Sequence, residues 1–351
     1  MRTPISPYLH WLGRLALFAG VALLASALLL PMLRIHTLDA ALPEAAAKFH
    51  GFATHPDRPN AVVLGSSVVR HHMVPAVFDS ITGLMWYNGG LSASFPPEAL
   101  LVAEEFIAGV APGSVTTVVV DVLPSSAPAQ ENTGTLRAAF PISFSEMVRR
   151  VLHARSIDDG RTAVETWMTH VLDFARHKDA IAAAVPGKEL AERGYAQLTE
   201  AENPGPWILA ERAKLLNQPD SVLALIRATS ADFRYRETAE DPTTGWTCDR
   251  RTDEAIARMQ LLLDAAAAKD IHLIFHFQKL WDTNGCIYFA ARKAFGPCHV
   301  TESMGWPAAG DTLTADDCFD PAHLAPSGAV KWSRYAAERI QAARACKGSD
   351  I

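Results

Sequence analysis

The stretch AVVLGSSVVR, residues 61–70, decides the fold of this chain. Its first five residues form a short apolar run with two adjacent valines, which is typical of a buried strand. The run ends at Gly65, Ser66 and Ser67, so a tight turn is predicted there. A buried strand that feeds such a turn is expected at the start of a parallel α/β sheet.

Further along the chain, predicted strands alternate with predicted helices. Strands are expected at residues 84–88, 114–122 and 271–277, and helices at residues 97–108, 252–269 and 328–345. In the last of these strands, alternation places one set of apolar residues on a single face: Ile271, Leu273, Phe275 and Phe277. Continuous apolar strands separated by helices predict a doubly wound parallel sheet with helices on both faces.

Residues 126–250 do not follow this alternation and are expected to form an insertion. The part from 147 to 185 is mostly helical in its pattern, and the part from 241 to 251 is rich in turn residues. Two roles are open for the insertion. It could be a lid over the substrate, or a helical appendage that only adds stability.

The composition excludes some classes of protein. The chain has 351 residues, which allows one large domain or two smaller ones. With 49% hydrophobic and 20% charged residues it is expected to be a folded globular protein. The net charge is −6, and no segment combines clustered basic residues with aromatic ones, so nucleic acid is not expected as a partner.

The N-terminal region contains an uncharged apolar run at residues 15–33, bounded by Arg14 and Arg34. Its 19 residues would extend roughly 28 Å as a helix, close to the hydrocarbon thickness of a bilayer. A retained transmembrane anchor is therefore predicted. A cleaved signal peptide is the alternative, but the small residues 25–27 lie inside the run and not after it.

The expected organisation follows from this anchor. Residues 1–14 form a cytoplasmic tail, residues 15–33 the anchor, residues 34–60 a polar linker, and residues 61–346 the main domain. The positive charges flanking the anchor are nearly balanced, so charge alone does not fix the orientation.

Cysteine usage suggests an oxidising compartment. All five cysteines lie in the last third of the chain and none forms a C-x-x-C pair: Cys248, Cys286, Cys298, Cys318 and Cys346. At least one disulfide is predicted, in the region that contains Cys286 and Cys298. Two bridges among five cysteines allow several arrangements and the sequence does not choose among them, although Cys286 with Cys298 would close a short loop. The alternative is five buried thiols in a cytosolic protein. No metal site or cofactor is expected, because His272 and His276 would stand about 13 Å apart on a strand.

Candidate site residues follow the predicted strands, since ligands of open α/β sheets bind beyond the carboxyl ends of the strands. Ser67 follows the first strand, and Asp320 and His323 precede the last helix. A serine on a strand-to-helix turn, with an aspartate and a histidine from a later loop, predicts an activated hydroxyl nucleophile. His276 is a further candidate near the end of its strand, whereas the adjacent His71 and His72 are expected to be solvated.

These motifs together resemble the SGNH (GDSL-like) hydrolase superfamily. VVLGSSVVR resembles its first block, in which the second serine, Ser67, is the nucleophile. WYNGGLSA resembles the second block, Asn-x-Gly-x-x-Gly, which begins at Asn88 and supplies Gly90 as the oxyanion glycine. DPAHLAPSGAVKW resembles the last block, which carries Asp320 and His323. The third block departs from the family, because residues 118–126 contain no Asn.

The resemblance is to the membrane-anchored branch of the superfamily, which includes the D-alanyl transfer protein of teichoic acid modification and exopolysaccharide acetylation proteins. It implies a flavodoxin-like three-layer sandwich and acyl-ester chemistry. The expected function is a serine esterase or O-acyltransferase, held at the inner membrane with its main domain in the periplasm. Its expected substrate is a cell-envelope or secreted polysaccharide. The alternative is a non-catalytic assembly partner of a membrane acyltransferase or polysaccharide synthase.

Overall fold

The structure is a computed structural model. It describes residues 11–22, 24–25, 42–92, 98–122, 148, 151–152, 161, 164, 187–199, 206–244, 248, 250–278, 285–320 and 323–346. The chain divides into two units, residues 1–46 with 132–183 and residues 47–131 with 184–351.

In the first unit, residues 11–22 form a helix that covers part of the predicted anchor. Among the helices that the structure describes, none is both long and apolar enough to cross a membrane. Residues 26–33 of the predicted anchor lie outside the described residues, as does most of the predicted helical region 147–185.

The second unit contains a five-stranded sheet in which all strands are parallel. The strands are β1 (Ala61–Gly65), β2 (Trp86–Gly90), β3 (Thr117–Val122), β4 (His272–Phe277) and β5 (Val300–Glu302). Their order is β2-β1-β3-β4-β5, so β2 and β5 form the edges. The predicted α/β fold with a parallel sheet is confirmed. The three-residue β5 was not predicted, because so short a run shows no alternation.

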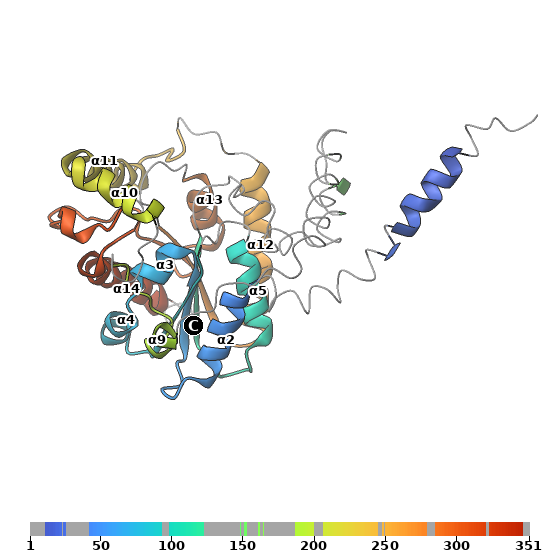
Figure 1. Ribbon diagram of the computed structural model, residues 1–351, viewed down its shortest axis with the longest axis horizontal. Helices are drawn as coiled ribbons and strands as arrows, with labels where there is room; N and C mark the ends of the chain where they lie inside the picture. Colours follow the sequence, from blue (N-terminus) through green and yellow to red (C-terminus); the bar gives the residue numbers. More distant parts are fainter. Residues whose placement is uncertain are drawn as a thin grey trace, which may run out of the picture. The chain divides into compact units, whose positions relative to one another are not determined.

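Helices surround the sheet in this unit. They are α2 (Pro43–Thr54), α3 (Ser67–His72), α4 (Pro75–Thr82), α5 (Glu98–Gly109), α9 (Gly187–Ala191), α10 (Pro206–Asn217), α11 (Pro219–Glu237), α12 (Arg250–Ala267), α13 (Cys286–Phe295) and α14 (Pro326–Cys346), with a short 3-10 helix, η2 (Ala315–Asp317). In Figure 1, α5 and α12 lie on one side of the sheet and α3, α4 and α14 on the other.

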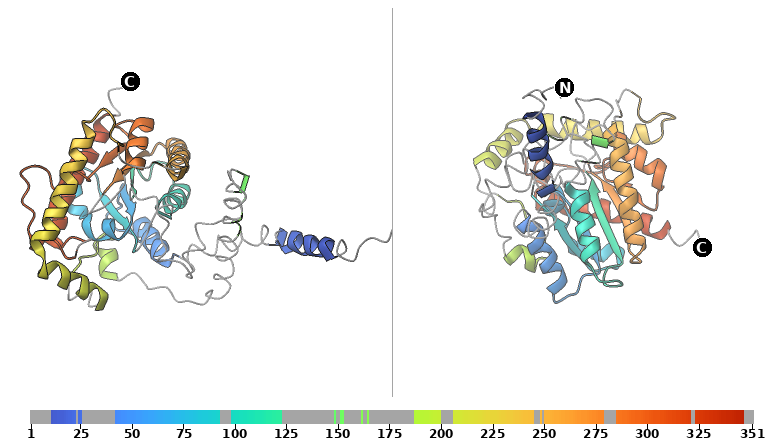
Figure 2. Two further views of the ribbon diagram at one scale, coloured as in Figure 1. Left: turned by 90° about the horizontal axis from the view of Figure 1, so that it is seen from above. Right: turned by 90° about the vertical axis from the view of Figure 1, so that its right-hand side faces the viewer.

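The α5 and α12 side holds one hydrophobic core. Leu64, Val120 and Phe275 point into it from the sheet, together with residues of α5, α12 and α13. The predicted alternation around β4 is confirmed, since the four residues expected on one face, Ile271, Leu273, Phe275 and Phe277, belong to this core. The views in Figure 2 show α5 and α12 side by side. Lys269, just after α12, donates to three carbonyls at the end of α5 and so joins the two helices.

The α14 side holds the second core. Val63, Val119 and Ile274 point into it from the sheet, opposite the buried Trp332 and Ile340 of α14. The spacing that predicted the last helix is therefore confirmed, because the residues three and four apart in α14 form its buried face. The loop residues Asp320 and His323 stand directly before this helix, so packing of α14 fixes where they can lie.

The predicted polar linker at residues 34–60 is wrong for residues 43–54, which form α2. Phe52 of this helix is buried, and its ring meets the rings of Tyr87 and Phe106 edge-on at 5.6 and 5.3 Å. The apolar residues are few and the helix is short, so its periodicity is weak in the sequence. Packing against the sheet stabilises a helix that would be marginal alone.

Two disulfides are present, which confirms the prediction of at least one bridge involving the region of Cys286 and Cys298, but these two cysteines do not pair with each other. Cys248 pairs with Cys286, and Cys298 pairs with Cys346. Cys286 is the first residue of α13 and Cys298 lies just beyond its end. The ten-residue helix separates the two by roughly 15 Å, far more than the ~6 Å between Cα atoms that a disulfide spans.

Candidate active site

Ser67, His323 and Asp320 form a hydrogen-bonded chain. Ser67 Oγ lies 3.0 Å from His323 Nε2. On the other side of the ring, His323 Nδ1 lies 3.0 Å from Asp320 Oδ2 and 3.1 Å from Oδ1. Ser67 begins α3 directly beyond the carboxyl end of β1, while the other two residues come from the loop before α14. Packing of the two helices thus brings together residues that are 256 positions apart in the chain.

The hydrogen bonds fix which nitrogen of His323 carries its proton. Asp320 is buried, and its Oδ1 also accepts the main-chain N–H of His323 at 2.8 Å. An ionised carboxylate only accepts hydrogen bonds, so His323 Nδ1 donates to it. The lone pair on Nε2 is then free to accept the hydroxyl proton of Ser67. This is the arrangement that activates a serine hydroxyl as a nucleophile.

Local sequence explains the position of Ser67. Ser66 is the N-cap of α3, and its Oγ accepts the N–H of Val68 at 3.3 Å. A capping serine ends the strand and starts the helix within one residue. Because Ser67 is the first helical residue, its own N–H has no acceptor one turn earlier in the helix.

Asn88 has a structural role in place of the predicted substrate contact. Its side chain is fully buried, and Nδ2 donates to the carbonyls of Val69 and Met73 at 2.8 and 2.7 Å. These bonds tie the end of α3 to β2. Asn88 therefore helps to hold the helix that carries Ser67, and its amide is not available to a ligand.

The predicted oxyanion role of Gly90 does not fit the structure. Its N–H already donates to Asn88 Oδ1 at 3.0 Å. Glycine is required here because the main chain of α3 lies very close to Gly90. A Cβ at this position would lie 2.2 Å from the nitrogen of Arg70 and 2.9 Å from the carbonyl oxygen of Ser66. Gly90 thus lets α3 lie directly against β2.

Replacing Gly90 by Ala is expected to destabilise the fold by at least about 2 kcal/mol, because the new methyl group meets main-chain atoms that only a shift of α3 can move. Urea unfolding of the purified protein measures this loss. Gly109→Ala is the matched control, since nothing lies within 4 Å of its Cβ position. Equal stability of the two variants would show that α3 and β2 are not in such close contact.

His276 lies apart from the Ser67 chain. Its Nδ1 is 3.0 Å from Asp121 Oδ1, and Gln278 Nε2 donates to Asp121 Oδ2 at 2.5 Å. Burial raises the pKa of Asp121, and the hydrogen bonds from the two side chains partly offset this rise. The ring of His276 meets Trp332 edge-on at 5.7 Å. His276 was predicted to reach the site. In the structure its described contacts instead join β4 to Asp121 of β3 and to Trp332 of α14.

The expectation that His71 and His72 are solvated is wrong. Both side chains are buried, and both rings lie edge-on to His323, with centroids 5.7 and 6.2 Å away. Helix α3 is only about one and a half turns long and packs against both β2 and α14, so its residues Val68, Val69, His71 and His72 are buried while Ser67 and Arg70 stay partly exposed. A pair of adjacent polar residues in a sequence gives no sign of such enclosure.

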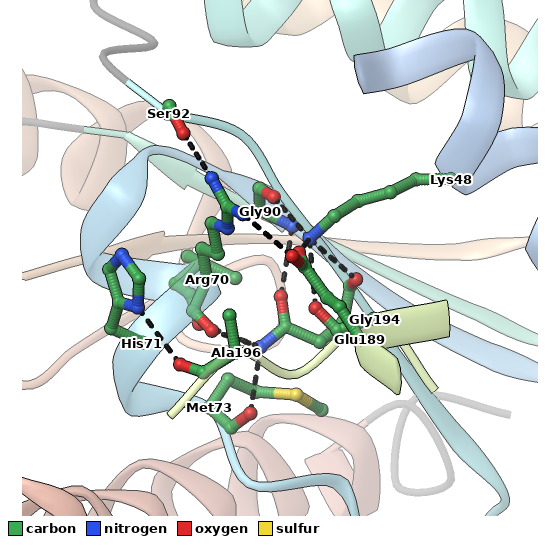
Figure 3. Close-up of polar contacts among 11 residues, drawn as sticks. Lys48, Arg70, His71, Met73, Gly90, Ser92, Glu189, Gly194 and Ala196 are labelled. Carbon is green, nitrogen blue, oxygen red and sulfur yellow. Dashed lines mark hydrogen bonds and ion pairs between the residues drawn. The ribbon is translucent and has the colours of Figure 1, made fainter. Parts of the chain in front are cut away.

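A buried lysine links the carboxyl end of β2 to α9 (Figure 3). Lys48 Nζ is fully buried, donates to the carbonyls of Gly90 and Gly194 at 2.6 and 2.8 Å, and lies 2.8 Å from Glu189 Oε1. The other carboxylate oxygen of Glu189 pairs with Arg70 at 2.6 Å. A buried charge is stable only when it is paired and hydrogen-bonded, as here. Neither residue of the Lys48–Glu189 pair was predicted, since 141 positions separate them.

The main chain that follows α9, at Arg193 and Gly194, covers the edge of β2. The carbonyl of Arg193 accepts the N–H of Asn88 at 2.8 Å. The next residue, Gly194, has a φ of +81°, and a Cβ there would lie 1.9 Å from the carbonyl oxygen of Asn88. Only glycine allows both the turn and the close approach.

Helices α10 and α11 of the insertion contact the loop that carries Asp320. Three guanidinium groups donate to main-chain carbonyls of this loop: Arg212 to Phe319 at 3.2 Å, Arg227 to Leu313 at 2.7 Å and Arg234 to Pro307 at 2.7 Å. The guanidinium of Arg212 also stacks 5.0 Å from the ring of Phe319. These contacts join α10 and α11 to the segment before α14, next to the candidate site, and leave open both roles considered for the insertion.

Within the described part of the chain, no three His, Cys, Asp or Glu side chains are arranged to hold a metal ion. Comparison of the chain with protein-family models, curated proteins and solved structures gives no match, so the geometry of the site is the basis for interpreting it.

Proposed function

We propose that the protein is an SGNH-type serine esterase or O-acyltransferase that acts on an acylated polysaccharide of the cell envelope or of a secreted polymer. The observation that carries this proposal is the continuous hydrogen-bond chain from Ser67 through His323 to Asp320. It lies at the carboxyl end of a parallel sheet, where α/β proteins bind ligands. The motif resemblance supplies the substrate class, and the parallel sheet agrees with the flavodoxin-like sandwich of that superfamily.

The proposed reaction has two steps. Ser67 Oγ forms a bond to the ester carbonyl carbon as His323 Nε2 takes the hydroxyl proton, and the tetrahedral adduct then expels the alcohol, which receives that proton. The acyl group remains on Ser67. In the second step a water molecule or a sugar hydroxyl loses its proton to His323 and attacks the acyl carbon. The bond from that carbon to Ser67 Oγ then breaks, His323 returns the proton to Oγ, and the free acid or the new ester leaves. Asp320 holds the ring and stabilises its charged form.

Stabilisation of the oxyanion is assigned to the N–H of Ser67 at the start of α3. Such a donor is often worth about 3 kcal/mol. A second donor at Gly90 would require its bond to Asn88 Oδ1 to break first.

The two disulfides favour an oxidising compartment, and this supports the proposal that the protein acts in the cell envelope. The two disulfides join elements 38 and 48 residues apart, and structural disulfides of this kind are typical of exported proteins. We therefore propose export, with the apolar segment at residues 15–33 as the inner-membrane anchor.

Labelling with a fluorophosphonate probe tests the proposed nucleophile. We expect one phosphonate adduct per chain, on the peptide that contains Ser67, because only an activated serine attacks the probe rapidly. Ser67→Ala should abolish the adduct. Ser80→Ala is the control, since Ser80 is exposed and bonds only within α4. An adduct at another serine, or none, would contradict the proposed nucleophile.

The engaged N–H of Gly90 favours a second candidate, a non-catalytic assembly partner of a membrane acyltransferase or polysaccharide synthase. A partner of this kind would need the fold but no oxyanion site. The two candidates differ in cells: if Ser67→Ala leaves polysaccharide acylation complete while deletion of the protein abolishes it, the assembly role replaces the enzymatic one.

A further inference from the structure

Three imidazole rings meet at the candidate site. His71 and His72, both from α3, lie edge-on to His323 at interplanar angles of 89° and 79°. Of the three, only His323 contacts a carboxylate in the described structure. The other two have main-chain partners, and those partners come from two distant segments of the chain.

His72 fixes the main chain beside His323. Its Nε2 accepts the N–H of Leu324 at 2.9 Å, and its own carbonyl accepts the hydroxyl of Ser333 from α14 at 2.6 Å. The side chain is fully buried. Because Nε2 accepts, the ring is neutral with its proton on Nδ1. Burial, and next the neighbouring His323, hold the pKa of His72 well below its usual range, so the ring remains an acceptor.

His71 approaches His323 from another side and has a different support. Its Nδ1 donates to the carbonyl of Ala196 at 2.9 Å, as Figure 3 shows, and the N–H of Ala196 returns a bond to the carbonyl of Arg70 at 3.2 Å. Ala196 follows the segment that Lys48 and Glu189 anchor. Burial lowers the pKa of His71 to about 3, with the nearby His323 as the second cause, so this ring is also neutral.

We propose that His71 and His72 are positioning residues for the proposed acyl transfer, holding the ring of His323 through two edge-on contacts in the orientation that faces Ser67. The inference rests on the proposed function. Each does so as a neutral ring with one specific main-chain hydrogen bond. Among these three rings, His323 is the one within hydrogen-bond distance of Ser67, with Nε2 3.0 Å from Oγ, whereas the hydrogen bonds described for His71 and His72 go to main-chain atoms.

Matched pairs of variants test this role. Gln at position 72 can place its Oε1 where Nε2 accepts from Leu324, whereas Phe fills the same space without an acceptor. Asn at position 71 can donate to Ala196 through Nδ2, whereas Leu cannot. We expect His72→Phe and His71→Leu to lower kcat for p-nitrophenyl acetate by about 100-fold with little change in KM, because small displacements of a catalytic group have effects of this size. The polar variants should retain kcat within about tenfold.

A proton NMR signal separates positioning from general support of the fold. The His323 Nδ1 proton, held by Asp320, is expected to give a strongly downfield resonance in the wild-type protein. This resonance should be lost or shifted in His72→Phe and kept in His72→Gln. Should the variants at position 72 fail to fold, the pair at position 71 decides the question.

The inference is overturned if the polar and apolar variants of folded protein have the same kcat and the same downfield resonance. That result would leave the proposed function intact, because Ser67 would still react with the fluorophosphonate. Failure of the proposed function appears differently, as a wild-type protein that neither hydrolyses the ester nor takes up the probe.

Discussion

Replacing Ser67 by Ala is expected to lower ester hydrolysis and acyl transfer by several orders of magnitude, on the order of 10⁴ to 10⁶. The Ser67 hydroxyl is the group proposed to form the bond to the acyl carbon, and Ala leaves His323 without the hydroxyl proton that it would take. Initial rates on p-nitrophenyl acetate, and on an acetylated polysaccharide, measure the loss. Full activity of Ser67→Ala would refute the serine mechanism.

The double variant provides the sharper test. His323→Ala should cost about as much as Ser67→Ala, and the two changes together little more, because residues that act as a unit are not additive. Asp320→Asn should leave the protein folded but reduce the rate, since an amide in place of the carboxylate favours the wrong tautomer of His323. Additive losses would mean that Ser67 and His323 act independently.

Reduction of both disulfides is expected to cause the largest loss of stability. Loop closure at separations of 38 and 48 residues predicts about 4 kcal/mol for each bridge. The melting temperature should fall by more than about 10 °C in the presence of a reductant. Differential scanning calorimetry, with and without dithiothreitol, measures the difference.

Thiol counting checks the same pairing. In denaturant without reductant, alkylation should modify one cysteine, the buried Cys318, and after reduction all five. Cys298→Ser should lower the melting temperature and free Cys346, whereas Cys318→Ala leaves both bridges intact and is the control. Five reactive thiols in protein taken from its native compartment would exclude the disulfides.

The sheet could be predicted largely from sequence because its strands are buried on both faces. Continuous apolar runs such as the one that became β1 have no helical alternative of adequate length, and the turn at Gly65 marks the end. By contrast, α2 and β5 have little periodicity of their own. Tertiary contacts, such as Phe52 against Phe106, stabilise them, and no local pattern reports these contacts.

Some residues of the candidate site could be predicted from the sequence, and others depend on tertiary contacts. Ser67, Asp320 and His323 carry recognisable chemistry next to predicted element ends, and the structure brings them within hydrogen-bond distance. The residues around them were misjudged or missed. His72 accepts a hydrogen bond from the main chain of Leu324, and Lys48 donates to main-chain carbonyls. These partners are distant in the chain, so the sequence gives no sign that the two residues support the site.

The covered edge of β2 has a consequence for self-association. An edge strand with free N–H and C=O groups is a template on which another copy can add a strand, the route to many aggregates. Here the main chain near Arg193 already occupies that template, and the left-handed turn at Gly194 gives an incoming strand no regular ladder to extend. The opposite edge, β5, is three residues long. The two edges of the described sheet therefore offer another copy of the protein little backbone on which to add a strand.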